Sequence, residues 1–423
     1  MKTRMRSIII IILQISFGVG CFAQSINHID WKSDLEYLKK ELPQNHIDLF
    51  FSMTENEFNK GVDNIIQQLP MMNDYGVADL LLKHIAKIKD NNIFVDFGTL
   101  NNPNKILPFS LYWFNKGLYI LATKHGCDNL LGKKLVKIND FKIEQIIDSL
   151  STLIPFDSYA RIKNNVPKMI CFLPHLNYFG FTKDETVSLE IEDYNGVYSV
   201  YKIKNEDLIE NNWIRFKPDS IAFCWKNKNK FFDEQYFEKD SIYYLQYNTC
   251  YSKELAKKSR NPKEEKNLPS FKKFEKKVIV IMKKKPVKKL VIDLRFNNGG
   301  SYDQLNELIS KLQDYKKVNQ KGKLFVVIGK QTFSSGLVNM IDFKGLTQAI
   351  FLGEESSGRP SHFGDVNFLI LPSSGLRISY PTKYYKYADE DKNSFRLDVK
   401  IETNFSDYKK GIDPVFDYIK TIK

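Results

Sequence analysis

The spacing of hydrophobic residues predicts helices in the first part of the chain. From about residue 30 to residue 90, apolar side chains recur every three or four positions, as in Phe58, Val62 and Ile65, which is the period of one helix face. Ser33 and Thr54 are each followed three positions later by Glu, and such capping boxes mark helix starts. We therefore expect a small N-terminal helical region.

From about residue 108 the pattern changes to short alternating strands and turns. The dipeptide Asn195-Gly196 separates two such strands and favours a tight hairpin turn. After residue 241, continuous apolar runs alternate with helical patterns, and these runs predict strands at 290–294, 324–328 and 349–352. This alternation predicts an α/β layer.

The first 24 residues have the composition of a secretory signal peptide. Basic residues precede the apolar run from Ile8 to Phe17, and Cys21 and Ala23 stand where a cleavage site requires small residues. The run is too short to cross a bilayer of about 30 Å, so we expect an exported protein, periplasmic or extracellular, without a permanent membrane anchor. A lipoprotein acylated at Cys21 is an open alternative.

No metal or cofactor is expected from the sequence. There is no Cys-x-x-Cys, no His-rich cluster and no G-x-G-x-x-G. Four cysteines follow the leader, and their spacing leaves open whether they form disulfides or remain buried thiols: Cys127, Cys171, Cys224 and Cys250.

The formal net charge of +13 is concentrated in one stretch. From Lys253 to Lys289 there are 15 Lys/Arg and 4 Asp/Glu. Phe271, Phe274 and Val278 lie at helical spacing among the lysines, which is typical of a surface helix with an apolar stripe and a solvated cationic face. Binding of an acidic partner or an anionic surface is the alternative, and no motif predicts a nucleic-acid partner.

Three loops that follow predicted strands carry the residues suited to chemistry, because sites in α/β sheets form at the carboxyl ends of strands. The first, Asp293–Gly300, ends in paired glycines and leads into a helix that we expect Ser301 to cap. The second, Thr332–Gly336, puts serines at a strand-to-helix turn, which is the geometry of a nucleophile elbow. The third is Gly353–Gly364.

In this order and spacing the three loops resemble the tail-specific (C-terminal processing) serine peptidase family, and most of all its branch related to interphotoreceptor retinoid-binding protein. The likeness is strong over residues 241–423 and fainter before them. It implies an α/β crotonase/ClpP-like peptidase domain over residues 236–423. It also implies an N-terminal helical region over 25–100 and a small, β-rich PDZ-like module over 101–235.

The resemblance also implies roles for individual residues. The second serine of the elbow, Ser335, would be the nucleophile. The backbone N–H groups of Gly336 and Gly300 would form the oxyanion hole. Arg295 and Asn297 would shape the first loop. Two residues of that loop are expected beside the substrate: Gly299 and Asn297.

The chain departs from the family pattern at the two positions where the family carries its general base. Processing peptidases of the family use a lysine in the third loop, where this chain has Arg359, and a guanidinium stays protonated at any useful pH. Other branches use a histidine where this chain has Asn92, whose amide takes no proton. The histidines nearest to these positions are His362, in the third loop, and His46, near the end of the first helical segment.

Two functional hypotheses follow. The first is an exported serine-type endopeptidase, a hydrolase that cleaves peptide or protein substrates through a Ser nucleophile and a backbone oxyanion hole. The second is a catalytically impaired homologue that binds a peptide or another ligand in the same groove. The intact elbow and glycine loop favour the enzyme, and the missing bases favour the binding protein.

Overall fold

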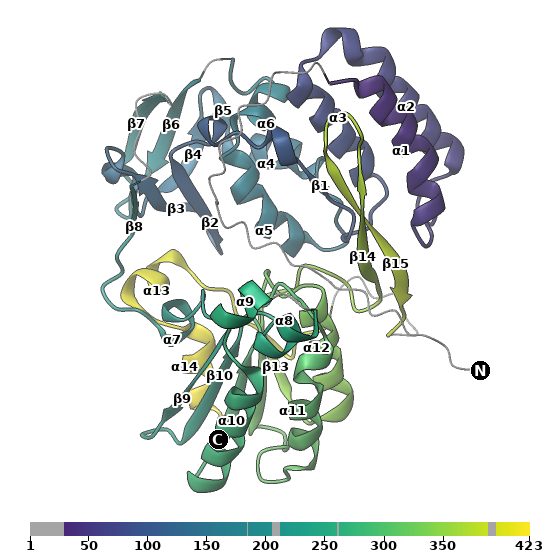
Figure 1. Ribbon diagram of the computed structural model, residues 1–423. Coiled ribbons are helices and arrows are strands. Elements are labelled where there is room, and N and C mark those ends of the chain that lie inside the picture. The colour runs from purple at the N-terminus through teal and green to yellow at the C-terminus, as the bar shows by residue number, and fades with distance from the viewer. Residues whose placement is uncertain (1–28, 184, 205–211, 260–261, 388–394) are drawn as a thin grey trace, which may run out of the picture.

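The computed structural model describes residues 29–183, 185–204, 212–259, 262–387 and 395–423. The predicted signal peptide at 1–24, with Cys21, lies outside these residues. Figure 1 shows an upper part, built from the N-terminal helices and a β-rich segment, above a lower part with a central sheet flanked by helices. The mixed α/β class predicted from the sequence is confirmed.

The N-terminal region folds into three helices, as the hydrophobic spacing predicts: α1 (Trp31–Asn45), α2 (Glu55–Gln68) and α3 (Asp74–Ala86). The capping box at Thr54 is confirmed, because its hydroxyl and the Glu57 carboxylate exchange hydrogen bonds with each other's backbone N–H. The capping box at Ser33 is wrong. The Asp30 carboxylate accepts from the Ser33 N–H, so α1 begins earlier and Ser33 lies within its first turn.

The β-rich segment contains an antiparallel sheet and three helices, of which α4 and α5 pack on the sheet. The sheet order is β2-β3-β4-β6-β7, and β5 and β8 pair with β4 and β3. Its strands are β2 (Phe109–Phe114), β3 (Gly117–Lys124), β4 (Lys134–Ile138), β5 (Phe141–Lys142), β6 (Thr186–Glu192), β7 (Tyr198–Lys204) and β8 (Trp213–Arg215). The helices are α4 (Ile143–Ser151), α5 (Tyr159–Ile170) and α6 (Leu173–Tyr178). The predicted hairpin at Asn195-Gly196 joins β6 to β7, and the PDZ-like character of this segment stays a prediction.

The lower part is built on a six-stranded sheet of order β16-β13-β12-β11-β10-β9, which is parallel except for β9. The strands are β9 (Phe232–Phe237), β10 (Ile242–Tyr247), β11 (Lys289–Asp293), β12 (Leu324–Ile328), β13 (Ile350–Gly353) and β16 (Val399–Lys400). The helices of this part are α7 (Phe223–Lys226), α8 (Lys253–Lys258), α9 (Pro262–Asn267), α10 (Phe271–Lys284), α11 (Asp303–Asp314), α12 (Ser335–Leu346), α13 (Phe405–Lys410) and α14 (Pro414–Thr421). The central strands are apolar on both faces because helices cover both faces.

A long hairpin connects the two parts. It consists of β14 (His362–Ile370) and β15 (Arg377–Tyr385), and β15 pairs with β1 (Val95–Asp96) of the upper part. The Asp34 carboxylate on α1 accepts hydrogen bonds from the backbone N–H groups of Ser373 and Ser374 at the hairpin tip, at 2.7 and 2.8 Å. Although it lies within residues 236–423, which the resemblance assigns to the α/β domain, the hairpin contributes its apolar residues to the core of the upper part.

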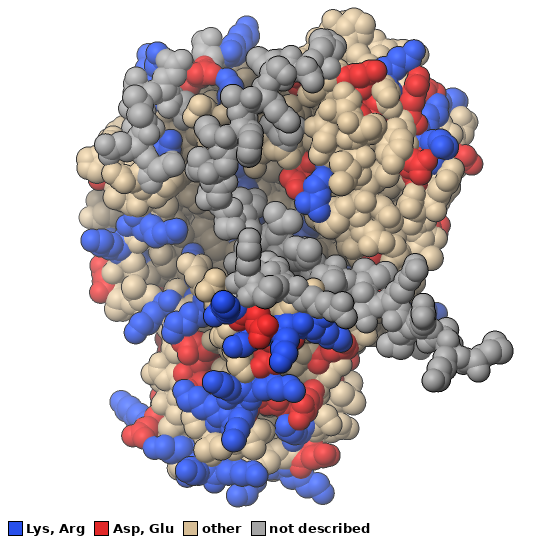
Figure 2. Space-filling view, in the orientation of Figure 1, with Lys and Arg blue, Asp and Glu red and all other residues tan. Residues whose placement is uncertain are grey.

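The basic stretch forms helices, and α10 has the predicted amphipathic character. Phe271 and Val278 are buried, while the lysines between them are exposed. Figure 2 shows Lys and Arg gathered over the lower part, where Figure 1 places α8–α10. Among the described residues, no helix is long and apolar enough to cross a membrane. The four cysteines after the leader are buried free thiols: Cys127, Cys171, Cys224 and Cys250.

Candidate active site

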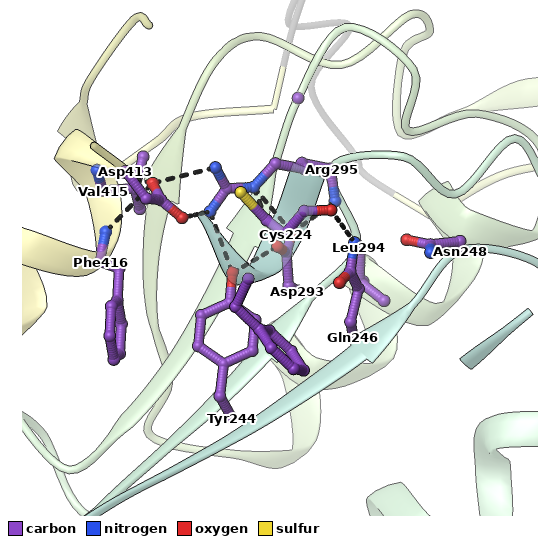
Figure 3. Close-up of polar contacts among 12 residues, drawn as sticks. Cys224, Tyr244, Gln246, Asn248, Asp293, Leu294, Arg295, Asp413, Val415 and Phe416 are labelled. Carbon is purple, nitrogen blue, oxygen red and sulfur yellow. Dashed lines mark hydrogen bonds and ion pairs between the residues drawn. The ribbon is translucent and has the colours of Figure 1, made fainter. Parts of the chain in front are cut away.

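A buried ion network fixes the start of the first predicted loop, directly after β11 (Figure 3). The Arg295 guanidinium binds both carboxylate oxygens of Asp413, at 3.0 and 2.9 Å, and its Nε lies 2.9 Å from Asp293. The Tyr244 hydroxyl donates to Asp293 at 2.5 Å. Burial alone would lower the pKa of Arg295, but the two carboxylates raise it well above its ordinary value. Arg295 therefore joins β11 to the start of α14, in the shaping role predicted for it.

Asn297 holds the next turn of the loop in place. Its side-chain NH₂ donates to the Tyr247 carbonyl at 2.9 Å, and its side-chain oxygen accepts from the Gly299 N–H at 2.9 Å. The residue is completely buried, so its amide faces backbone on both sides. Asn297 thus shapes the loop, and its additional assignment as a substrate contact stays a prediction, with both side-chain groups bonded to backbone here.

The paired glycines allow the loop to pass very close to its neighbours. Gly299 and Gly300 have φ of 110° and 137°, a region that L side chains rarely adopt. A Cβ at Gly299 would lie 2.8 Å from the Ser334 Cβ, and one at Gly300 would lie 2.3 Å from the Cys250 carbonyl oxygen. In the described part of the chain no hydrogen bond uses the Gly300 N–H, which leaves it available as a donor. The expected cap of the following helix by Ser301 is wrong, because α11 begins at Asp303 without a side-chain cap.

The elbow separates its two serines by a sharp backbone turn. Ser334 has φ 51° and ψ −124°, an uncommon conformation for a non-glycine residue, and its side chain does not cap α12. Ser335, by contrast, is 5% exposed, and its hydroxyl donates to the Gly300 carbonyl at 2.5 Å. The geometry therefore disagrees with the assignment of Ser335 as nucleophile and favours Ser334.

The oxyanion donors shift with the nucleophile. The Gly336 N–H donates to the Phe333 carbonyl at 3.0 Å, so the geometry does not favour the oxyanion role predicted for it. The amide directly after Ser334 belongs to Ser335, and within the described residues it is not used in any hydrogen bond. A free N–H one position after the reacting serine is the donor that an elbow supplies.

Ser334 borders a cavity of about 650 Å³ that lies between the upper and lower parts. Aromatic and aliphatic side chains form most of its wall: Phe94, Val95, Phe97, Met169, Phe172, Phe333, Val366 and Phe368. Polar and charged residues complete it: Asn92, Asp96, Asn101, Lys168, His175, Asn298, Ser334 and Arg377. The cavity can hold a largely apolar group with a few polar contacts close to the serine.

Neither position at which the family carries its base supplies one here. Asn92 borders the serine's cavity, but its side-chain NH₂ donates to the Phe363 carbonyl at 2.5 Å. Arg359 and His362 border a different cavity of about 460 Å³. The His362 ring stacks on Tyr385, its Nδ1 lies 2.9 Å from the Pro360 carbonyl oxygen, and burial lowers its pKa.

His46 is equally unsuited as a base. Its Nε2 lies 3.1 Å from the Asp90 carboxylate, and its Nδ1 accepts from the Asp48 N–H at 3.0 Å. Both ring nitrogens are thus occupied, and the ring is almost fully buried. His46 fixes the turn after α1.

Two titratable residues that no sequence motif indicated do border the serine's cavity. Lys168 lies on α5, and His175 lies on α6 with its Nδ1 2.6 Å from Asp79. Both lie in a segment where the likeness to the peptidase family is faint. The tertiary packing of α5 and α6 brings them to the cavity, so no local signal could have identified them.

A serine elbow and a glycine loop at the carboxyl ends of adjacent parallel strands define a site of the serine-hydrolase type. The model for peptidase family S41 matches residues 266–321 of the chain. This match confirms the resemblance to tail-specific peptidases, whereas the likeness to the interphotoreceptor retinoid-binding branch stays a prediction. A sequence comparison with curated proteins found no match.

Two solved structures of mature CPAF support the fold. Mature CPAF complexed with lactacystin is similar at a TM-score of 0.59 and 12% identity, over 92% of this chain and 96% of that one. Mature CPAF alone gives the same TM-score and identity, over 92% and 95% of the two chains. The photosystem II D1 C-terminal processing protease aligns at a TM-score of 0.39 and 13% identity, over 87% and 92%.

Proposed function

We propose that this protein is an exported serine-type peptidase of the tail-specific kind, with Ser334 as its nucleophile. The observation that carries the proposal is the conformation of Ser334. It occupies a positive-φ turn between β12 and α12, its hydroxyl makes no capping bond, and it borders the large cavity. A serine in an ordinary N-cap would instead use its oxygen to accept a backbone N–H.

The surrounding backbone fits acyl transfer. When the Ser334 Oγ attacks a peptide carbonyl, negative charge develops on the carbonyl oxygen. The free N–H groups of Ser335 and Gly300 are the donors proposed to stabilise it. Removal of one such donor typically slows catalysis about 10²–10³-fold. The bond between Ser335 Oγ and the Gly300 carbonyl connects the two halves of this oxyanion hole.

The second candidate is a catalytically impaired homologue that binds peptide or another ligand. The observation in its favour is the amide of Asn92, which occupies the position of a family histidine and donates to a carbonyl. The apolar cavity would then serve recognition alone.

Covalent labelling with a fluorophosphonate separates the two candidates, because it reports an activated serine without requiring a known substrate. We expect labelling of the protein without its leader and its loss in Ser334→Ala. Ser335→Ala keeps both N–H donors and should still label, although more slowly because it loses the bond to the Gly300 carbonyl. Peptide mapping should locate the adduct on Ser334. Labelling that survives Ser334→Ala but disappears in Ser335→Ala would contradict the proposed nucleophile. An unlabelled protein that still binds peptide would favour the second candidate.

A further inference from the structure

The helix that follows the elbow contacts the glycine loop through two side chains. Ser335 and Asn339 lie four residues apart on α12, so both are on the same face of the helix. The Ser335 hydroxyl donates to the Gly300 carbonyl at 2.5 Å. One turn further along, the side-chain NH₂ of Asn339 donates to the Tyr302 carbonyl at 3.0 Å. The helix therefore holds the loop at two carbonyls that are two residues apart.

A buried thiol contacts the other end of the Asn339 amide. The Cys250 Sγ lies 3.4 Å from the side-chain oxygen of Asn339 and 3.5 Å from that of Asn297. Burial raises the pKa of Cys250 to about 12, so the thiol keeps its proton and can donate it to either oxygen. All three side chains are completely buried. The Asn339 amide is thus fixed at both ends, by Tyr302 and by Cys250.

The backbone groups on both sides of the Gly300 N–H are also held. The Gly299 carbonyl accepts from the Cys250 N–H at 2.8 Å, and the Ser301 N–H donates to the Cys250 carbonyl at 2.8 Å. Gly300 itself has no Cβ to restrict it, and its φ is 137°. The direction of its N–H therefore depends on the contacts that its neighbours in the loop make.

We propose that Asn339 is a positioning residue for the oxyanion hole. This inference rests on the proposed function, in which the N–H groups of Ser335 and Gly300 stabilise one oxygen. The first donor begins α12 and the second belongs to the glycine loop, so their separation depends on how the loop is joined to the helix. The bond from Asn339 to the Tyr302 carbonyl fixes the loop beyond Gly300 and keeps the two donors together.

Asn339 acts through the loop and not through the substrate. It is completely buried, and it is not among the residues that line the cavity beside Ser334. Its loss should therefore slow the chemical step and leave the binding of a reagent in the cavity unchanged.

The test is fluorophosphonate labelling of the protein without its leader at a series of reagent concentrations. It gives the maximal rate, the concentration that produces half of that rate, and the amount of protein labelled at completion. Asn339→Leu keeps the approximate size of the side chain and removes both of its hydrogen bonds. Since a misplacement of about 1 Å can cost about 100-fold in rate, we expect the maximal rate to fall by about 10- to 100-fold. The half-saturating concentration and the final amount labelled should not change.

A second pair of variants changes the thiol that contacts Asn339. Cys250→Ala removes the thiol but leaves the bond from Asn339 to Tyr302, so the maximal rate should fall less than in Asn339→Leu. Cys250→Ser supplies a hydroxyl donor at the same position and should label faster than Cys250→Ala.

The matched control is Asn319→Leu, at the opposite end of the same two helices. The Asn319 side chain donates to the Gln313 carbonyl at 2.8 Å and accepts from the Gln348 N–H at 2.7 Å. It thus joins the C-terminal ends of α11 and α12, about 18 Å along the helix axis from the elbow. Asn319→Leu also removes two hydrogen bonds, but its maximal labelling rate should equal that of the wild type.

Each outcome decides the inference. Wild-type kinetics in Asn339→Leu would overturn it and leave the proposed function intact. A smaller labelled amount at an unchanged rate would also overturn it, because Asn339 would then only stabilise the fold. Equal slowing in Asn319→Leu would have the same meaning. If Asn339→Leu does not fold, wild-type rates in Cys250→Ala would overturn the inference. A wild-type protein that never labels at Ser334 would refute the proposed function and this inference together.

Discussion

The Arg295 network yields the sharpest prediction about stability, because its three charges are buried together. The substitution Asp413→Asn removes one carboxylate charge but keeps a side chain of the same shape. The asparagine oxygen can still accept the N–H groups of Val415 and Phe416, as Asp413 does at the start of α14. The substitution therefore keeps the cap of α14. It removes the charge and also replaces the acceptor of the second Arg295 hydrogen bond by an amide donor.

The expected loss of unfolding free energy depends on the ion pair with Asp293 that Arg295 keeps in the variant. Removing one partner of a buried ion pair typically costs about 3–5 kcal/mol. Asp293 remains within 2.9 Å of the guanidinium, so we expect the lower end, about 3 kcal/mol. Asp413→Ala also removes the helix cap and should cost about 1 kcal/mol more.

Urea denaturation followed by fluorescence measures the free energy of unfolding of both variants. The matched control is Asp417→Asn on the same helix, where the carboxylate is half exposed and pairs with Lys420. This exposed pair should contribute less than about 1 kcal/mol. Equal losses for Asp413→Asn and Asp417→Asn would refute the reasoning that burial makes the Arg295 network costly to break.

Two further predictions concern other parts of the molecule. Burial, and to a smaller extent the charge of Lys87, lowers the pKa of His84 to about 4. The neutral His84 ring therefore contributes stability above the ordinary histidine pKa of about 6.5, and this contribution is lost as the pH falls toward 4. Relative to His84→Leu, the wild-type free energy of unfolding should fall by up to about 3 kcal/mol over that range in urea titrations, and an unchanged difference would contradict the assignment. On α10, replacing Lys272, Lys276 or Lys283 by Gln should change stability by only a few tenths of a kcal/mol. Micromolar, salt-dependent heparin binding that these changes abolish would show that the basic face binds an anionic partner.

The sequence predicted the regular elements best where the local pattern and the tertiary environment agree. The strand expected at 324–328 has the same bounds in the structure, because a fully buried parallel strand is a continuous apolar run. The capping box at Ser33 failed because Asp30, three residues earlier, offers a competing cap. Where two caps stand this close, the local pattern alone does not choose between them.

The residues of the candidate site could not all be identified from the local sequence pattern. Ser334 and Ser335 are adjacent and chemically identical, and only the backbone turn at Ser334 decides which hydroxyl meets the cavity. The roles of Arg295 and Asn297 in shaping the loop were predictable, because they lie within the first loop itself. Lys168 reaches the cavity through the packing of α5, which no spacing of residues encodes.

The hairpin of β14 and β15 also has a consequence for the order in which the protein folds. The Phe94 N–H bonds to the Ser379 hydroxyl, 285 positions later in the chain. During synthesis, α1–α3 and β1 therefore emerge long before β14 and β15, which pair with β1 and share a hydrophobic core with the three helices. Contacts between residues this far apart in sequence slow folding, and apolar surfaces that are not yet packed stay exposed for longer. A chain that ended before β14 would keep the apolar face of its N-terminal helices uncovered, and it would be a ready substrate for aggregation or for quality-control proteases.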